Sequence, residues 1–284
     1  MGTGFSGGSL AVFTALAPAG AVAFAVAAAF VLTHRGVSSA LRDRMNHATI
    51  VPLGVAWAGF IASATHLGTP ANALHAVEGI GRSPLSNEVV AVVAFLFFAG
   101  VYWLYTYKLS YSRRFADVLA VSAIASCVGM VVLMAVAYSV PTVASWNTWH
   151  APVDLMLSAF VGGASLSLSL LRAFSPETTR WCVVLRRVLP FFILALMLGH
   201  ASYAAFLSGI TNNVACAADA VPFYGALIGV FTGMALAGWA LQLVFSRLSG
   251  WRAAALDACG CTLVFGALLI ARLPFYEAYL SVGF

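Results

Sequence analysis

Residues 59–88 place ionisable side chains between two long apolar runs. They read GFIASATHLGTPANALHAVEGIGRSPLSNE, with His66 closing the first run and Glu88 opening the second. An imidazole accepts a proton near neutral pH, because its unperturbed pKa is about 6.5. A carboxylate can accept or relay another proton. Ionisable groups at membrane depth are costly and are therefore functional candidates by default. Their types and spacing suit a reaction that releases two protons beside a membrane, such as the oxidation of a quinol.

Each of these residues also has a simpler structural explanation. A histidine at a helix end is most often an interfacial polar group. Glu88 in the first turn of its helix would meet the helix dipole favourably. Arg82 could pair with Glu78 or Glu88. The gathering of these groups on one side of the membrane is what favours a site.

The composition sets the elements that must position this segment. The protein has 284 residues, of which 62% are hydrophobic and 8% are charged, and its mean hydropathy is +0.96. Ordinary soluble domains carry about 25% charged residues. In lipid every backbone polar group must be paired internally, which leaves helices or closed barrels. The apolar runs are continuous and do not alternate, so we predict an all-α membrane protein.

Eight segments approach the roughly 20 residues that a helix needs to cross the hydrocarbon core. The N-terminal residues carry no basic group, so the first span is expected to be retained rather than removed as a signal peptide. We predict a single integral membrane domain over residues 1–284, with spans near 10–33, 48–67, 89–109, 115–140, 153–171, 183–207, 222–245 and 253–273.

The basic residues predict the orientation of this bundle. Twelve of the 14 Lys and Arg residues fall in or beside alternate connections, and only Arg82 and Arg272 fall on the other side. By the positive-inside rule the twelve are cytoplasmic, so both termini face outward, into the periplasm. The formal charge of +5 is thus a topology signal and does not indicate a nucleic-acid surface. The predicted location is the inner (cytoplasmic) membrane of a prokaryote.

The cysteines and histidines predict no metal centre in this protein. The five cysteines form no C-x-x-C pair, and no ligand spacing for zinc or an iron–sulfur cluster is present. A b-type haem would need histidines that face each other inside the bundle, and only His66 and His200 are candidates. We therefore predict no haem and no metal, so electrons would leave directly to a partner subunit.

Two other function classes remain open from the residues alone. The protein could be a passive membrane tether without quinol chemistry. It could also be a proton- or solute-conducting transporter, which would need ionisable groups at mid-membrane, where His200 is the main candidate.

The motif GFIASATHLGTP followed by LSNE resembles the DmsC family, the membrane anchor subunits of dimethyl sulfoxide reductase and related molybdoenzymes. Eight spans with outward termini are also similar to that family, and the likeness is looser at Trp146–Trp149 and at Arg272-x-x-Phe275-Tyr276. The resemblance implies quinol-site roles for His66 and Glu88 as the catalytic pair. The residues implied to bind the quinol are His66, Gly68, Pro70, Arg82, Ser86, Asn87, Glu88, Trp146, Trp149, Arg272 and Tyr276.

The resemblance also implies a substrate and partners. Menaquinol would be oxidised near the outer face without haem, and its electrons would pass to an iron–sulfur electron-transfer subunit. Molybdopterin would be held by a separate catalytic subunit, also on the outer face. The outward loops near residues 70–86, 141–152 and 208–221 are the docking candidates. The sequence does not specify the terminal oxidant.

Overall fold

The computed structural model describes residues 5–65, 78–108, 110–174, 179–211, 216–244 and 250–279. Eight helical segments among the described residues are long and apolar enough to cross a membrane, the second of them, Ser39–Ala64, being formed by α2 and α3 together. The described residues contain no β-strand, so the all-α membrane fold with eight spans is confirmed. The helices are α1 (Phe5–Thr33), α2 (Ser39–Ala48), α3 (Ile50–Ala64), α5 (Pro84–Thr106), α6 (Arg113–Ala137), α7 (His150–Phe174), α8 (Thr179–Ser208), α9 (Tyr224–Val244) and α10 (Trp251–Glu277), with a short 3₁₀ helix η2 at Ala217–Ala220.

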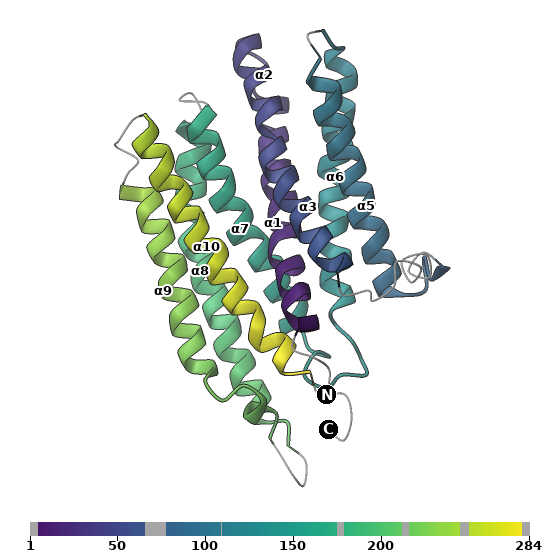
Figure 1. Ribbon diagram of the computed structural model, residues 1–284, viewed down its shortest axis with the longest axis vertical. Helices are drawn as coiled ribbons and strands as arrows, with labels where there is room; N and C mark the ends of the chain where they lie inside the picture. Colours follow the sequence, from purple (N-terminus) through teal and green to yellow (C-terminus); the bar gives the residue numbers. More distant parts are fainter. Residues whose placement is uncertain are drawn as a thin grey trace.

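Helix α1 lies in the middle of the bundle and packs against α3, α6, α7 and α10. In Figure 1, α5 and α6 stand on one side of it, and α8, α9 and α10 stand on the other. Of the 29 residues of α1, 13 are alanine or glycine, which let neighbouring helices approach closely in a membrane. Its first turns lie beside the end of α10, where the Thr14 and Tyr276 hydroxyls are 3.0 Å apart. The first and last helices therefore end at the same end of the bundle.

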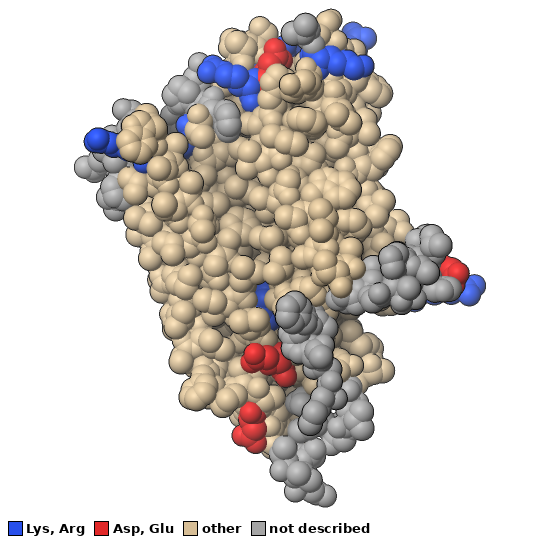
Figure 2. Space-filling model, viewed as in Figure 1, with Lys and Arg blue, Asp and Glu red and all other residues tan. Residues whose placement is uncertain are grey.

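The opposite end of the bundle carries most of the positive charge (Figure 2). There the connections after α1 and α5 meet, since Arg35 pairs with Asp117 at 3.2 Å and Arg42 donates to the Tyr111 hydroxyl at 3.3 Å. The loops that charge counting groups together do share one end. Which face of the membrane this end meets stays a prediction from the positive-inside rule.

The first basic connection carries Arg35, Arg42 and Arg44, a charge run that predicts a solvated loop. It instead forms α2, whose N-cap Ser38 accepts a hydrogen bond from the backbone N–H of Leu41. Asn46 of α2 is 1% exposed and accepts a 2.7 Å hydrogen bond from the Tyr102 hydroxyl of α5. The buried face of α2 therefore ties this connection to the bundle.

Helices α9 and α10 cross where two glycines face each other. A Cβ atom added to Gly238 would lie 2.5 Å from the carbonyl oxygen of Gly260, and one added to Gly260 would lie 2.6 Å from that of Gly238. Neither backbone can move without separating the helices. The small side chains thus set the distance between α9 and α10.

We expect Gly238→Ala to destabilise the folded protein by about 1–3 kcal/mol, as overpacking of a tight contact does. The matched control is Gly233→Ala on the same helix, where an added Cβ meets no atom within 4 Å. Thermal melting of the detergent-solubilised protein measures the difference. Equal melting temperatures for the two variants would contradict the close helix crossing.

Candidate functional site

The start of α5 is held in place by contacts among its own residues. Ser83 is the N-cap and accepts a hydrogen bond from the backbone N–H of Ser86, and Pro84 occupies the first turn. The Asn87 side chain accepts a 2.7 Å hydrogen bond from the backbone N–H of Gly81, whose φ of 80° favours glycine. These contacts fix the direction in which α5 leaves the loop, and so they orient Glu88.

Glu88 points into the bundle rather than toward solvent. Its side chain is 1% exposed, and neither carboxylate oxygen has a hydrogen-bond partner among the described residues. Because the N-cap is Ser83, Glu88 lies in the second turn of α5, so the first-turn dipole explanation is wrong. Arg82 is exposed, and no ion pair joins it to Glu88 in the described part of the sequence. Glu88 is a buried carboxylate that is poised to receive a hydrogen-bond donor.

Tyr138, at the end of α6, connects Glu88 to the last helix. Burial raises the pKa of its hydroxyl well above the ordinary value, and the neighbouring Tyr276 and Glu88 raise it further. The positive charge of Arg272 lowers the pKa of the Tyr138 hydroxyl. The ring centroids of Tyr138 and Tyr276 are 6.0 Å apart, and those of Trp146 and Tyr276 are 5.9 Å apart. The structure therefore packs Tyr276 and Trp146 close to Tyr138, and Glu88 and Arg272 are near enough to act on its hydroxyl. The sequence reasoning missed Tyr138, although it ends a span on the side predicted to face outward.

The two tryptophans of the loop before α7 play different structural parts. Trp146 is 9% exposed, donates a 2.8 Å hydrogen bond to the carbonyl oxygen of Phe275, and stacks on that ring at 4.7 Å. Trp149 is 58% exposed and stacks on His150 at 3.9 Å. The structure brings Trp146 to the group around Tyr138. Trp149 instead fits the interfacial anchor that tryptophan commonly forms at a membrane surface.

Arg272 belongs to a second buried group, which we call the polar network. It is 1% exposed, and its Nη1 lies 2.7 Å from Oδ2 of Asp154. The other carboxylate oxygen of Asp154 lies 2.9 Å from Nε2 of His200, whose Nδ1 is 2.7 Å from the Tyr224 hydroxyl. The polar network comprises Asp154, His200, Tyr224 and Arg272, from α7, α8, α9 and α10. The sequence reasoning singled out His200 and Arg272 separately and assigned no role to Asp154.

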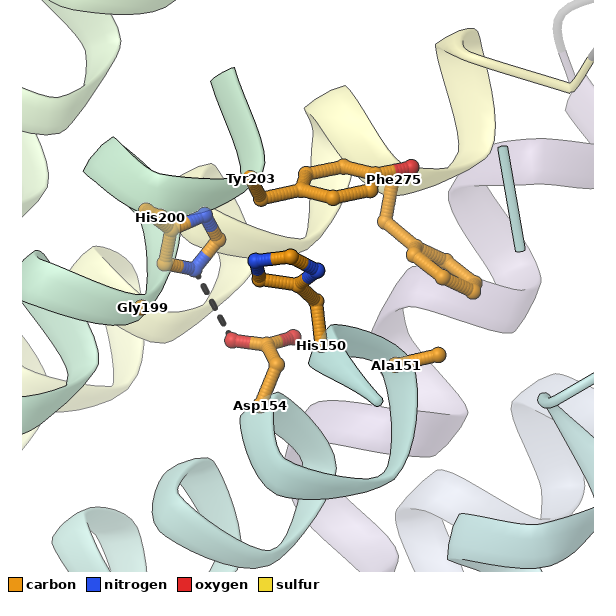
Figure 3. Close-up of a pocket in the computed structure, with 7 residues that line it drawn as sticks. All are labelled: His150, Ala151, Asp154, Gly199, His200, Tyr203 and Phe275. Carbon is orange, nitrogen blue, oxygen red and sulfur yellow. Dashed lines mark ion pairs between the residues drawn. The ribbon is translucent and has the colours of Figure 1, made fainter. Parts of the chain in front are cut away.

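A small cavity borders the polar network, with room for about one water molecule. Figure 3 shows His150 and Asp154 of α7 facing His200 and Tyr203 of α8 around it. The imidazole of His150 lies 3.0 Å from the Ser202 hydroxyl and 2.7 Å from the Thr148 hydroxyl. His150, which the sequence placed at a loop edge, is the first residue of α7 and is 7% exposed.

Three predicted site residues lie outside the described residues, namely His66, Gly68 and Pro70. The sequence also predicts a short surface helix with Thr69 as its N-cap and Pro70 as its first residue, and it falls in the same gap. The pairing of His66 with Glu88 therefore stays a prediction. Ser86 and Asn87 lie where the motif predicts, beside Glu88 at the start of α5.

Within the described residues, no group of three His, Cys, Asp or Glu side chains could hold a metal ion. Both ring nitrogens of His200 lie within 3 Å of other side chains, Asp154 and Tyr224. His200 would have to leave the polar network in order to bind a haem iron.

Comparison with known proteins gives the family. The model of the family "DMSO reductase anchor subunit (DmsC)" matches residues 1–278. The sequence is 30% identical to the C subunit of anaerobic dimethyl sulfoxide reductase of Escherichia coli (strain K12), over all of its own length and 98% of that protein. It is 29% identical to the C subunit of the Haemophilus influenzae enzyme and 26% identical to the YnfH subunit of Escherichia coli, each again over its whole length and 98% of the relative. This multi-pass membrane protein therefore belongs to the DMSO reductase anchor subunit family.

Proposed function

We propose that this protein anchors a DMSO-reductase-like molybdoenzyme in the prokaryotic cytoplasmic membrane and oxidises menaquinol near the outer face. The observation that carries the proposal is Glu88, a buried carboxylate with no hydrogen-bond partner among the described residues. A buried acceptor that is left unpaired is costly in the absence of a ligand. A quinol hydroxyl is a donor of the kind that would satisfy it.

The proposed reaction uses two proton acceptors and one electron acceptor. One quinol hydroxyl donates to Glu88, and the other donates to His66. Both O–H bonds break as two electrons leave, one at a time, for the iron–sulfur clusters of the partner subunit, and a quinone is formed. Trp146 and Tyr276 supply flat apolar surface beside the ring. Protons and electrons leave on the same side, so this step builds no membrane potential.

The family and the relatives support the partner assignment. The family is described as the anchor of DMSO reductase, and the relatives are named as components of anaerobic dimethyl sulfoxide reductase. We infer that an iron–sulfur subunit and a molybdopterin catalytic subunit dock on the outer face. Of the predicted docking loops, the one near 141–152 packs its Ser145 and Trp146 into the bundle and leaves Trp149 exposed. Near 208–221, Asp219 is exposed on η2.

The test is the reduction of the partner's clusters by menaquinol in the intact complex. We expect anaerobic mixing with menaquinol to generate the electron paramagnetic resonance signal of reduced clusters in the complex that contains this protein. A complex of the two partner subunits alone should respond to dithionite and remain oxidised with menaquinol. If the complete complex also stays oxidised with menaquinol but responds to dithionite, the protein is a passive tether.

A further inference from the structure

A buried series of proton-carrying groups crosses the outer half of the bundle beside the Glu88 site. It begins in the polar network, where His200 lies between the Tyr224 hydroxyl and the Asp154 carboxylate. An ion pair alone would hold α7 to α10, since Asp154 and Arg272 already meet at 2.7 Å. His200 adds a titratable group to that pair, and a purely structural pair does not need one.

The net charge of Glu88 and the polar network favours the binding of one proton. Asp154 and Arg272 are both buried, and their charges cancel. Glu88 adds one buried negative charge when it is ionised, and it acts on Tyr138 together with Arg272. Uncompensated buried charge is costly, so the region favours one bound proton. That proton can be on Glu88, or on His200 with Asp154 as its counter-charge.

A route for a proton leads from the polar network to the surface of the protein. The cavity between Asp154, His200 and His150 has room for about one water molecule, which can bridge polar groups that are too far apart for a direct hydrogen bond. His150 in turn lies 3.0 Å from the hydroxyl of Ser202, which is exposed. The ionisable side chains around this path are Asp154, His150, His200, Arg272, Tyr203 and Tyr224.

We propose that the polar network is a proton-release path for the quinol site, in which His200 takes up the proton that leaves Glu88 and passes it through His150 to the surface. This inference rests on the proposed function. Tyr138 links the two regions, because its ring centroid lies 6.2 Å from that of Phe275, which lines the cavity beside His200 and His150. Glu88 is also near enough to Tyr138 to act on its hydroxyl. Each cycle returns Glu88 and His200 to their starting protonation states. The two quinol electrons meanwhile pass one at a time to the partner's iron–sulfur clusters. His200 and His150 are positioning and relay residues here and do not touch the quinol.

The test compares His200→Gln and His150→Gln in the intact complex with His34→Gln, a histidine at the opposite, basic end of the bundle. Glutamine keeps a hydrogen-bonding side chain but does not carry a proton at neutral pH. We expect menaquinol-driven cluster reduction to slow by about 10- to 100-fold in the first two variants, which is less than the roughly 10²- to 10⁴-fold effect of a group that exchanges a proton with the reacting molecule itself. The rate should fall further in deuterated solvent than it does for wild type. Binding of a quinol-analogue inhibitor and the melting temperature should stay unchanged, and His34→Gln should match wild type.

Wild-type rates in both His200→Gln and His150→Gln would overturn the path. So would slowing that comes with lost inhibitor binding or lowered melting, or slowing without a larger solvent isotope effect, because each of these indicates a structural role. If His200→Gln does not assemble, His150→Gln carries the same test. Failure of the proposed function is separate, since the wild-type complex itself would then not be reduced by menaquinol.

Discussion

Glu88→Gln is expected to lower menaquinol-dependent turnover of the assembled complex by about 10²- to 10⁴-fold, the usual range for loss of a proton-transferring group. Glutamine has nearly the same volume as glutamate and keeps one acceptor oxygen. The quinol hydroxyl should therefore still find a hydrogen-bond acceptor at this position. It cannot accept the quinol proton. The loss should therefore fall mainly on kcat, and menaquinol-driven cluster reduction should slow with it.

The thermal stability of the Glu88→Gln variant should not fall along with its turnover. Glu88 is 1% exposed and has no hydrogen-bond partner among the described residues, so an amide in its place removes a group that can only become charged at a cost. We expect the melting temperature of the complex to stay the same or to rise. The matched control is Asp117→Asn, at the basic end of the bundle, which should keep wild-type turnover. Near-normal menaquinol turnover in Glu88→Gln, with the complex assembled, would remove Glu88 from the quinol site.

The second large effect concerns stability and falls on Arg272. Arg272→Gln should destabilise the protein by about 3–5 kcal/mol, because it leaves the Asp154 carboxylate buried without its cation. The double variant Arg272→Gln, Asp154→Asn should recover much of that loss, since the remaining side chains are neutral. Thermal unfolding of the solubilised protein gives the ranking of the three forms.

An exposed ion pair serves as the control for this prediction. Arg35 pairs with Asp117 at 3.2 Å, and its side chain is 68% exposed. Arg35→Gln should cost about 0–1 kcal/mol, as surface ion pairs do. If Arg272→Gln is no more harmful than Arg35→Gln, or if the double variant is less stable than the single one, the buried pair is not what holds this end of α10.

The placement of Glu88 shows how far sequence reasoning reaches into the site. The run Ser83-Pro84 predicts a helix start, because a serine cap and a proline in the first turn are local preferences. The apolar run that follows predicts a span. The direction of the Glu88 side chain depends on which elements surround α5, and α5 packs mainly against α6. The sequence therefore located the residue and left its surroundings open.

The membrane architecture follows from the sequence alone. Eight apolar runs predict eight helices, because spanning the hydrocarbon requires about 20 residues in one continuous segment. The clustering of basic residues in alternate connections predicts loops that share one end, and the structure places Arg35 beside Asp117 there. Both signals are local or are counted along the sequence, so no knowledge of helix contacts is needed.

Only the tertiary structure decided which polar groups meet. Asp154 and Arg272 are 118 residues apart in the sequence, and hydropathy cannot pair them. It also cannot separate Trp146, which packs on Phe275, from the exposed Trp149 three residues later. The physical reason is that burial of a side chain inside a membrane bundle depends on helix rotation and on packing against neighbours. In lipid the outer face of each helix is as apolar as the inner one. The amino-acid pattern along one helix therefore does not indicate which other helices pack against it.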